Sequence, residues 1–394
     1  MRARLVFGVC CAVVLMGATV YAQSATGYAA PLTRFGLDSV ASAETYVEHD
    51  GAEAGAAIDL LGGWQAGPVQ ILARPVLRRD HDGDWSADVY QLAVRHDRGR
   101  RVRMRLEAGY LPSPIGISPL ETRASDNPLV APITSYTARL PLFEEGTPQT
   151  QLASPLYPLA VQATWSTTRW DLRTAVLESS LVRVRPLTGD DKPPRAPQFA
   201  IGGGVTPLVG LRVGASAAFG RYARADEVAG GLGGDRHARI LSVDGDYSVA
   251  YTRVYGDFVH TRLERAAGYT TATALTVTAV QTLTPRWYVA ARGQRLTTSH
   301  LLASGYGSPH DEPYHHPYPE EGYAFEALGG YVHAPDEALT DLGPSDALTI
   351  ETGVGFRLSP DLTVRASYLG YRAFGDRELE HHAVFSLVWT RRWF

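Results

Sequence analysis

Cysteine is nearly absent from this sequence of 394 residues, and both of its cysteines, Cys10 and Cys11, stand near the beginning. They lie in residues 1–22, which hold two arginines, then an apolar run, and then the small-residue motif VYA. This is the layout of a secretory signal peptide, and it predicts cleavage after Ala22. Cleavage would remove both cysteines, so neither a thiol nor a disulfide would stabilise the mature chain.

Lysine is almost missing as well, because Lys192 is the only lysine among the 37 basic residues. The formal net charge of −4 becomes −6 when the two arginines of the signal peptide are subtracted. A net negative charge argues against nucleic acid as a partner.

Long apolar runs do not occur after residue 22, whereas a helix that spans a bilayer needs about 20 apolar residues. The sequence has period-two alternation instead, most clearly in 209–219 (VGLRVGASAAF), 348–358 and 362–368. A soluble β-sandwich also alternates. The number of such segments, the signal peptide and the aromatic end of the sequence favour a transmembrane β-barrel.

Sixteen segments have the alternation of spanning strands, which predicts an all-β fold, a transmembrane antiparallel β-barrel. Short turns of such a barrel lie on the periplasmic side and long connections outside, so the two kinds must alternate along the chain. The predicted tight turns always follow an even-numbered strand. A stretch at 322–334 could add a hairpin and raise the count to eighteen. The predicted strands are 36–48, 54–65, 68–78, 86–97, 101–112, 158–168, 170–181, 197–206, 209–222, 238–249, 251–264, 268–283, 286–299, 346–358, 361–374 and 381–394.

The last predicted strand ends in Trp393 and Phe394. Because every backbone polar group must be paired in hydrocarbon, this strand has to pair with the first one and close the barrel. The chain here resembles the outer-membrane β-barrel proteins of Gram-negative bacteria, whose final strand ends in phenylalanine and is read by the assembly machinery. In this chain Trp393, and not Phe394, shares the predicted lipid-facing parity with Ala383, Phe385, Leu387 and Trp389.

The resemblance implies export to the outer membrane and three parts of the chain. These are a signal peptide at 1–22, a short periplasmic segment at 23–35 and the barrel at 36–394. It also implies contact with outer-membrane lipid and lipopolysaccharide, recognition by the barrel-assembly machinery, and a homotrimer.

The connection after the fifth strand, about 112–157, is long and rich in proline and apolar residues. Stretches of this length without regular patterning are usually functional or disordered. Sixteen-stranded porins resemble this plan, because their third external loop follows the fifth strand and folds into the lumen. The alternative is that the connection caps the barrel or packs against a neighbouring subunit. The charged residues predicted to line the constriction are Glu121, Arg123, Asp126, Arg139, Glu144 and Glu145.

The inward parity of the strands predicts a charged channel lining. The predicted lining residues are Arg74, Arg78, Arg95, Arg103, Arg105, Glu107, Arg212 and Arg365, with further inward charges at Asp59, Asp171, Arg173, Asp244, Asp246, Arg292, Glu351 and Arg357. A tight turn near residue 99 would place Arg95 opposite Arg103. Ladders of arginine favour anions, which suggests a mild anion preference. Equally, these charges could only keep the lumen wet and brace the wall through salt bridges.

Other motifs are weaker. The segment 310–316 (HDEPYHH) has side chains that can bind Zn²⁺ or Ni²⁺. Metal geometry needs fixed ligands, and this segment has the composition of an exposed loop, so neither a metal site nor a cofactor is predicted. The sequence has no G-x-S-x-G nucleophile elbow.

The sequence therefore favours a non-enzymatic outer-membrane porin, a channel for the passive diffusion of small hydrophilic solutes and ions. One alternative is an adhesin or receptor that works through its long external connections, especially 300–345. A further alternative is an outer-membrane hydrolase, but the histidines lie in loops without a convincing serine partner.

Overall fold

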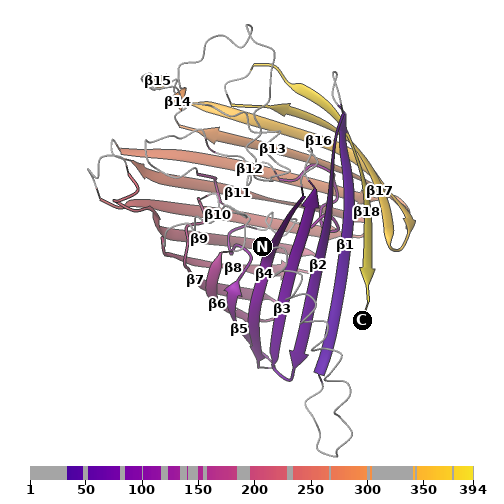
Figure 1. Cartoon of the computed structure of the whole chain (residues 1–394), viewed down its shortest axis with the longest axis horizontal. Helices are drawn as coiled ribbons and strands as arrows, with labels where there is room; N and C mark the ends of the chain where they lie inside the picture. Colours follow the sequence, from indigo (N-terminus) through magenta and orange to yellow (C-terminus); the bar gives the residue numbers. More distant parts are fainter. Residues whose placement is uncertain are drawn as a thin grey trace, which may run out of the picture.

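Sixteen strands of the computed structural model pair edge to edge in a closed antiparallel barrel, which confirms the predicted fold class. Figure 1 shows β1–β4 next to β16–β18, where the two ends of the strand order meet. Among the described residues, no helix is long and apolar enough to cross a membrane. The structure describes residues 33–47, 52–79, 85–99, 101–116, 123–133, 140, 150–153, 158–183, 196–228, 234–265, 268–299, 302–303, 340–341, 344–374 and 377–393.

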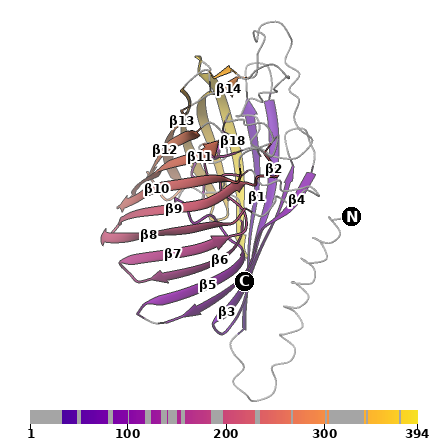
Figure 2. The same cartoon turned by 90° about the vertical axis from the view of Figure 1, so that its left-hand side faces the viewer.

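The strand bounds follow the predicted segments closely. The barrel strands are β1 (Thr33–Val47), β2 (Ala52–Ala66), β3 (Val69–Arg79), β4 (Trp85–Arg98), β5 (Arg103–Tyr110), β6 (Leu159–Ser166), β7 (Trp170–Leu177), β8 (Gln198–Leu208), β9 (Leu211–Ala223), β10 (Arg236–Val249), β11 (Thr252–Arg265), β12 (Gly268–Thr282), β13 (Trp287–Thr298), β16 (Ser345–Ser359), β17 (Leu362–Arg372) and β18 (Glu380–Arg392). Figure 2 shows β5–β10 stacked in chain order along one wall.

The barrel contains sixteen strands and not eighteen. β13 pairs directly with β16, from Trp287 opposite Phe356 to Thr298 opposite Ser345. Two short strands between them, β14 (Leu302–Ala303) and β15 (Thr340–Asp341), form a separate two-stranded sheet. The hairpin considered at 322–334 lies outside the described residues.

Tight turns follow the even-numbered strands from β2 to β12 and also join β16 to β17, in agreement with the predicted alternation. The turn that the sequence located least well joins β10 to β11 through Ala250 and Tyr251. Ala250 has a φ of 49°, which makes it the one non-glycine residue with positive φ in the described part of the chain. By the convention for such barrels, these turns mark the periplasmic end, and the long connections mark the external end.

The seam between β1 and β18 closes the barrel. The main-chain N–H of Trp393 donates to the carbonyl of Leu37 at 2.9 Å, and its indole Nε1 donates to Ser39 Oγ at 2.9 Å. Arg392 forms an ion pair with Asp38 at 2.9 Å. The Trp393 side chain is 47% exposed on the outer face, whereas Phe394 lies outside the described residues.

The outer face of the barrel carries a belt of exposed apolar side chains, including Val161, Leu241, Val243, Phe385 and Leu387. Each is at an outward position of its strand, so the alternation assigns the two faces as predicted. Aromatic residues are exposed near the periplasmic turns, at Trp170, Tyr251, Trp287 and Trp393. An apolar belt edged by aromatic side chains is the surface that a bilayer requires.

The inner face has two parts of different chemistry. On β2–β5 the inward positions include several charged residues; we call this the charged wall, and it includes Asp59, Arg74, Arg95, Asp97, Arg105 and Glu107. On the external half of β6–β13 they are small and apolar; we call this the apolar wall, and it includes Ala160, Ala175, Ala200, Ala218, Ala238 and Ala272. Side chains from the connections pack on the apolar wall, among them Leu111, Ile115, Leu152 and Val182. The core of the protein therefore lies inside the barrel, on one side of it.

Candidate functional site

Residues 123–133 of the connection between β5 and β6, here called the crossing segment, contact the inner faces of β16 and β17. The backbone N–H groups of Val130 and Ala131 donate to Glu351 Oε1 at 2.9 and 3.0 Å. Arg365 donates to the carbonyl of Leu129 at 3.1 Å and to that of Ala124 at 2.7 Å. The connection leaves the barrel wall at β5, so the chain reaches the far wall through the interior.

Arg292 and Glu351 anchor this segment. They lie directly opposite each other on β13 and β16, with 3.9 Å between Nη1 and Oε2, and both side chains are fully buried. Arg292 also donates to Asn127 Oδ1 at 2.6 Å and to the carbonyl of Ala131 at 2.9 Å. Buried charges are costly unless they are both paired and hydrogen-bonded. The crossing segment supplies those hydrogen bonds, so anchor and segment stabilise each other.

Apolar contacts complete the attachment. Leu129 packs with Tyr288 and Ala290, and Val130 and Ala131 pack with Leu369 and Val384, on the opposite side of the barrel from the apolar wall's connections. The connection is thus attached to the barrel at two places, on two different inner surfaces. Nearer β6, residues 150–153 are tied to the apolar wall through Thr261 Oγ1, which donates to the carbonyl of Leu152 at 2.8 Å.

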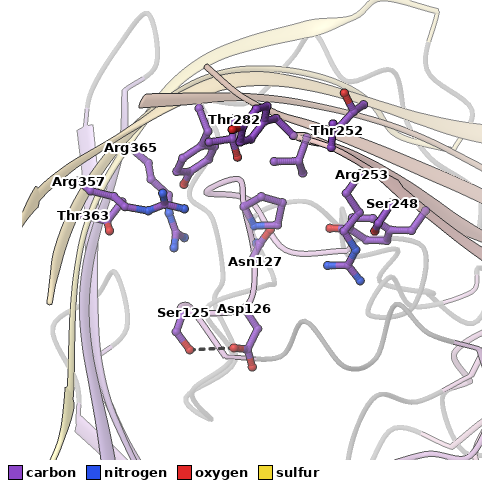
Figure 3. Close-up of a pocket in the computed structure, with 16 residues that line it drawn as sticks. Ser125, Asp126, Asn127, Ser248, Thr252, Arg253, Thr282, Arg357, Thr363 and Arg365 are labelled. Atoms are coloured by element: carbon purple, nitrogen blue, oxygen red, sulfur yellow. Dashed lines mark hydrogen bonds between the residues drawn. The ribbon is translucent and has the colours of Figure 1, made fainter. Parts of the chain in front are cut away.

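A cavity of about 400 Å³ lies on the periplasmic side of the crossing segment. Figure 3 shows Arg357 and Arg365 on one side of it, Arg253 on the other, and Asp126 and Asn127 between them. Arg253 is paired with Asp246 at 2.8 Å. Arg357 donates to the carbonyl of Pro285 at 3.0 Å and lies over the ring of Tyr288. Arg365 donates to main-chain carbonyls, and within the described part of the chain neither Arg357 nor Arg365 has a carboxylate at ion-pair distance.

The charged wall is braced by ion pairs near β2 and β3. Arg74 donates to Asp59 through Nε and Nη2, with the shortest contact at 2.6 Å, and both side chains are buried. Arg123 of the crossing segment approaches the same carboxylate at 3.5 Å. The Arg78 guanidinium lies 5.0 Å from the centre of the Tyr90 ring. Arg123, which the sequence predicted as a residue of the constriction, thus has its described partner on β2.

The register between β4 and β5 corrects one prediction. Arg95 lies opposite Glu107, with which it forms an ion pair at 2.7 Å, and it does not lie opposite Arg103. Arg103 and Arg105 both pair with Asp97, at 2.5 and 2.9 Å. In the strand register Arg98 lies opposite Met104, so the turn between the two strands is longer than expected. Each arginine therefore meets a carboxylate where the sequence suggested a repulsive pair.

Arg212 is also neutralised. It lies between Asp244, at 2.5 Å, and Asp171, at 3.2 Å. Glycine at 204 and 214 makes room for this cluster, because a Cβ at Gly204 would lie 2.6 Å from Arg212 Nη2 and one at Gly214 would lie 2.6 Å from Asp244 Oδ1. Small inward residues thus let the guanidinium lie flat against the wall.

Several predicted residues cannot be placed. Glu121, Arg139, Glu144, Glu145 and the histidine-rich segment 310–316 lie outside the described residues. Asp126 is described, and it accepts a hydrogen bond from Ser125. The sequence identified Arg292 and Glu351 as inward charges but did not indicate that they hold the crossing segment. Asn127 was missed altogether; its place before Pro128 indicates a turn, but nothing in the sequence specifies a partner on β13.

Solved structures with the same architecture are outer-membrane proteins. The chain is similar to OmpT of Vibrio cholerae in a loop-deletion form, with 10% identity, a TM-score of 0.55 and coverage of 92% of this chain and 99% of that one; the trimer form of OmpT gives a TM-score of 0.51. It is similar to OprB of Pseudomonas putida, at 10% identity, a TM-score of 0.54 and coverage of 92% and 94%. It is also similar to an anion-selective porin of Comamonas acidovorans, at 9% identity, a TM-score of 0.53 and coverage of 92% and 100%.

No family model and no curated relative matches the sequence. At these identities the similarity establishes the fold, and the chain accordingly has the sixteen-stranded barrel fold of outer-membrane porins.

Proposed function

We propose that this protein forms a channel across the outer membrane for the passive diffusion of small hydrophilic solutes. The observation that carries the proposal is the combination of an apolar outer belt, a charged wall inside and a cavity beside the crossing segment. Barrels of sixteen strands are wide enough to leave an aqueous channel. Substrates would cross without energy input and without covalent chemistry, so we propose no enzymatic activity.

The crossing segment would set the size limit. It occupies part of the interior and is held by the buried Arg292–Glu351 anchor, which favours a fixed narrowing over a loose flap. Ions and solutes would pass between this segment and the charged wall and through the cavity on the periplasmic side of the segment, because the apolar wall is covered by packed side chains. This arrangement supports passage of small solutes in preference to large ones.

We infer a mild anion preference that comes from few residues. On the charged wall, Arg74, Arg95 and Arg105 each have a carboxylate partner, so the arginine ladder contributes little net charge. Arg357 and Arg365, which line the cavity, have no such partner among the described residues. Unpaired cations at a narrow point attract anions more strongly than paired ones. The preference is therefore assigned to these two residues and not to the ladder on β3–β5.

Single-channel recording in a planar bilayer under a salt gradient tests this proposal. Stable current steps, with a reversal potential that indicates anions, are the expected result. Arg357→Gln is expected to shift that potential towards cations, whereas Arg103→Gln, which removes an arginine that is paired with Asp97, is expected to shift it less. A correctly folded barrel that carries no current would overturn the channel. An unchanged potential in Arg357→Gln would overturn the assignment of selectivity.

The fold and the resemblance support further proposals about context. We propose export with a cleaved signal peptide at 1–22, assembly by the barrel-assembly machinery, residence among lipid and lipopolysaccharide, and a homotrimer. An adhesin or receptor role would rest on the long external connections, most of which lie outside the described residues. Size-exclusion chromatography with light scattering tests the trimer directly.

A further inference from the structure

Two arginines on the outer surface of the barrel face each other near its external end. Arg239 of β10 and Arg262 of β11 are direct partners in the strand register. Both share the outward parity of exposed apolar neighbours on the same strands, Leu241 and Phe258. They therefore point away from the channel and towards the membrane. Like charges directly opposite each other on a ladder are destabilising.

Neither arginine is neutralised by a residue that the structure describes. Within the described part of the chain, no carboxylate lies at ion-pair distance from Arg239 or Arg262, although most other arginines of the barrel have one. Arg262 lies over the ring of Tyr269, 3.5 Å from its centre, and its Nε is buried without a hydrogen-bond partner. The acid next along this face, Glu264, is bonded by the ring and the main-chain N–H of His237.

The depth of the pair places it at the edge of the apolar belt. On β10 the outward residues from Val249 to Leu241 include exposed apolar side chains, and Arg239 is the next outward position after Leu241. Phe219 of β9 lies opposite Arg239 and is also exposed. Both arginines are three residues from the external ends of their strands. This position corresponds to the head-group level of the outer leaflet.

The neighbouring outward residues are polar donors. His260 and Thr273 lie opposite each other on β11 and β12 and are hydrogen-bonded at 2.9 Å, and Thr271 lies opposite Arg262. The patch therefore combines two cations and hydroxyl groups directly above apolar side chains. A lipid with an anionic head group matches both parts of this patch, because its head group would contact the cations and hydroxyl groups and its acyl chains the apolar side chains. A free anion would contact only the cations and hydroxyl groups.

We propose that Arg239 and Arg262 bind a phosphate group on the head of an outer-leaflet glycolipid, of the phosphorylated-disaccharide class found in lipopolysaccharide. Guanidinium groups bind phosphate through paired, charge-assisted hydrogen bonds. A bound phosphate would relieve the repulsion across the ladder, and its acyl chains would cover Phe219 and Leu241. The interaction surface is thus a lipid site on the outer wall, separate from the channel.

Arg295 of β13 offers a matched control. It too points outward near the external end, and its side chain is 63% exposed. Unlike the proposed pair, it is held by Asp346 at 3.1 Å, and Asp346 also pairs with Arg372 at 2.9 Å. A general effect of removing surface charge would be the same for Arg295→Gln as for the proposed residues.

The experiment titrates the refolded protein in detergent with bis-phosphorylated lipid A and measures the bound fraction by native mass spectrometry. The double variant Arg239→Gln/Arg262→Gln is expected to bind at least about tenfold more weakly, because it loses two charge-assisted contacts. Arg295→Gln is expected to bind like the wild type. Equal affinity of the double variant and the wild type, or an equal loss in Arg295→Gln, would overturn the site.

A second arm needs only the wild-type protein and therefore holds even if the double variant fails to fold. Enzymatically dephosphorylated lipid A is expected to bind at least about tenfold more weakly than the bis-phosphorylated form. Equal binding would overturn the role of phosphate, and displacement of the lipid by an equal concentration of inorganic phosphate would overturn the lipid as its source. Channel conductance of the double variant is expected to be unchanged, so this inference and the channel proposal fail separately.

Discussion

The charged wall and the apolar wall lie inside the same barrel, but their side chains meet different partners. On the charged wall, inward residues contact each other across neighbouring strands, as Arg95 does with Glu107. On the apolar wall, alanines such as Ala175 and Ala200 form one buried cluster with side chains brought in by the connections, such as Leu152. Small residues leave space for a second layer, whereas long charged residues fill the space themselves.

The difference shows that an inward position is not necessarily a wet one. Alternation distinguishes lipid-facing from inward residues, and it does so on both walls. The chemistry of the inward set then depends on what covers it. Where a connection packs inside, the wall becomes the base of an apolar core, and only the uncovered wall is left to line the proposed channel.

The largest effect is expected from removing a buried arginine of the anchor, in comparison with removing an arginine of the charged wall. Arg292→Ala leaves the carboxylate of Glu351 buried without its cation and removes the hydrogen bond to Asn127. Breaking a buried pair in this way costs about 3–5 kcal/mol. Urea unfolding from lipid vesicles measures the free energy, and single-channel recording should show a larger or noisier conductance as the crossing segment loosens.

Arg105→Ala is the matched substitution on the charged wall. Its pair with Asp97 is partly exposed, with side-chain exposures of 29% and 25%. Partly exposed pairs contribute only about 0–1 kcal/mol. Equal losses of stability in the two variants would contradict the view that the anchor is buried and the Arg105–Asp97 pair is partly solvated.

Leu152→Ala tests the cover of the apolar wall. Leu152 is fully buried against the barrel, and its removal should create a cavity at a cost of about 2–4 kcal/mol in the free energy of unfolding. Leu152→Met, which nearly conserves volume, should cost less than about 1.5 kcal/mol. If both variants unfold at the wild-type urea concentration, residues 150–153 do not contribute to the core.

Glu107→Gln tests the balance of charge on the charged wall. It removes the carboxylate that neutralises Arg95, so the reversal potential should shift towards anions, with a loss of about 1–2 kcal/mol in stability. Arg95→Gln should shift the potential the opposite way, and the double variant should return near the wild type. If neither single variant changes the reversal potential, the conducting path does not run along this pair.

Asp235 belongs to neither wall and should give the smallest effect. Hydrogen bonds from Arg221 and the main-chain N–H of Ala225 lower the pKa of this exposed carboxyl below its usual range. The resulting stabilisation is present above the unfolded pKa of about 3.9 and is lost as the pH falls through the lower folded pKa. Asp235→Asn should therefore slightly reduce the acid dependence of the urea midpoint, with no change in conductance.

Strand number, order and facing were predictable because each depends on a local pattern. Period-two alternation in 209–219 and 348–358 assigned lipid-facing residues correctly, and the alternation of short and long connections gave the count. The register between β4 and β5 was not predictable from the same pattern. Gly99 has a φ of 97° and opens a turn that extends to Arg103, which moves Arg95 opposite Glu107.

The contacts of the anchor and of the apolar wall could not be predicted from the sequence for another reason. Arg292 and Glu351 are separated by the long connection between β13 and β16, so no turn fixes their register in advance. Ala175 and Ala200 have inward parity, but nothing in the sequence indicates that they form one cluster with side chains of a connection, such as Leu152. Contacts between a connection and a distant wall depend on tertiary packing, which a periodic pattern does not encode.

The seam between β1 and β18 joins residues that are very far apart in the chain. The contacts of Arg392 with Asp38 and of Trp393 with Ser39 both span 354 positions. Contacts of such high order form late in folding, because the intervening chain must first be ordered. Until then, both edge strands expose unpaired backbone groups that can capture other chains. Substitutions at Ser39 or Trp393 should therefore act mainly on the yield and rate of assembly, leaving barrels that do close with a normal channel.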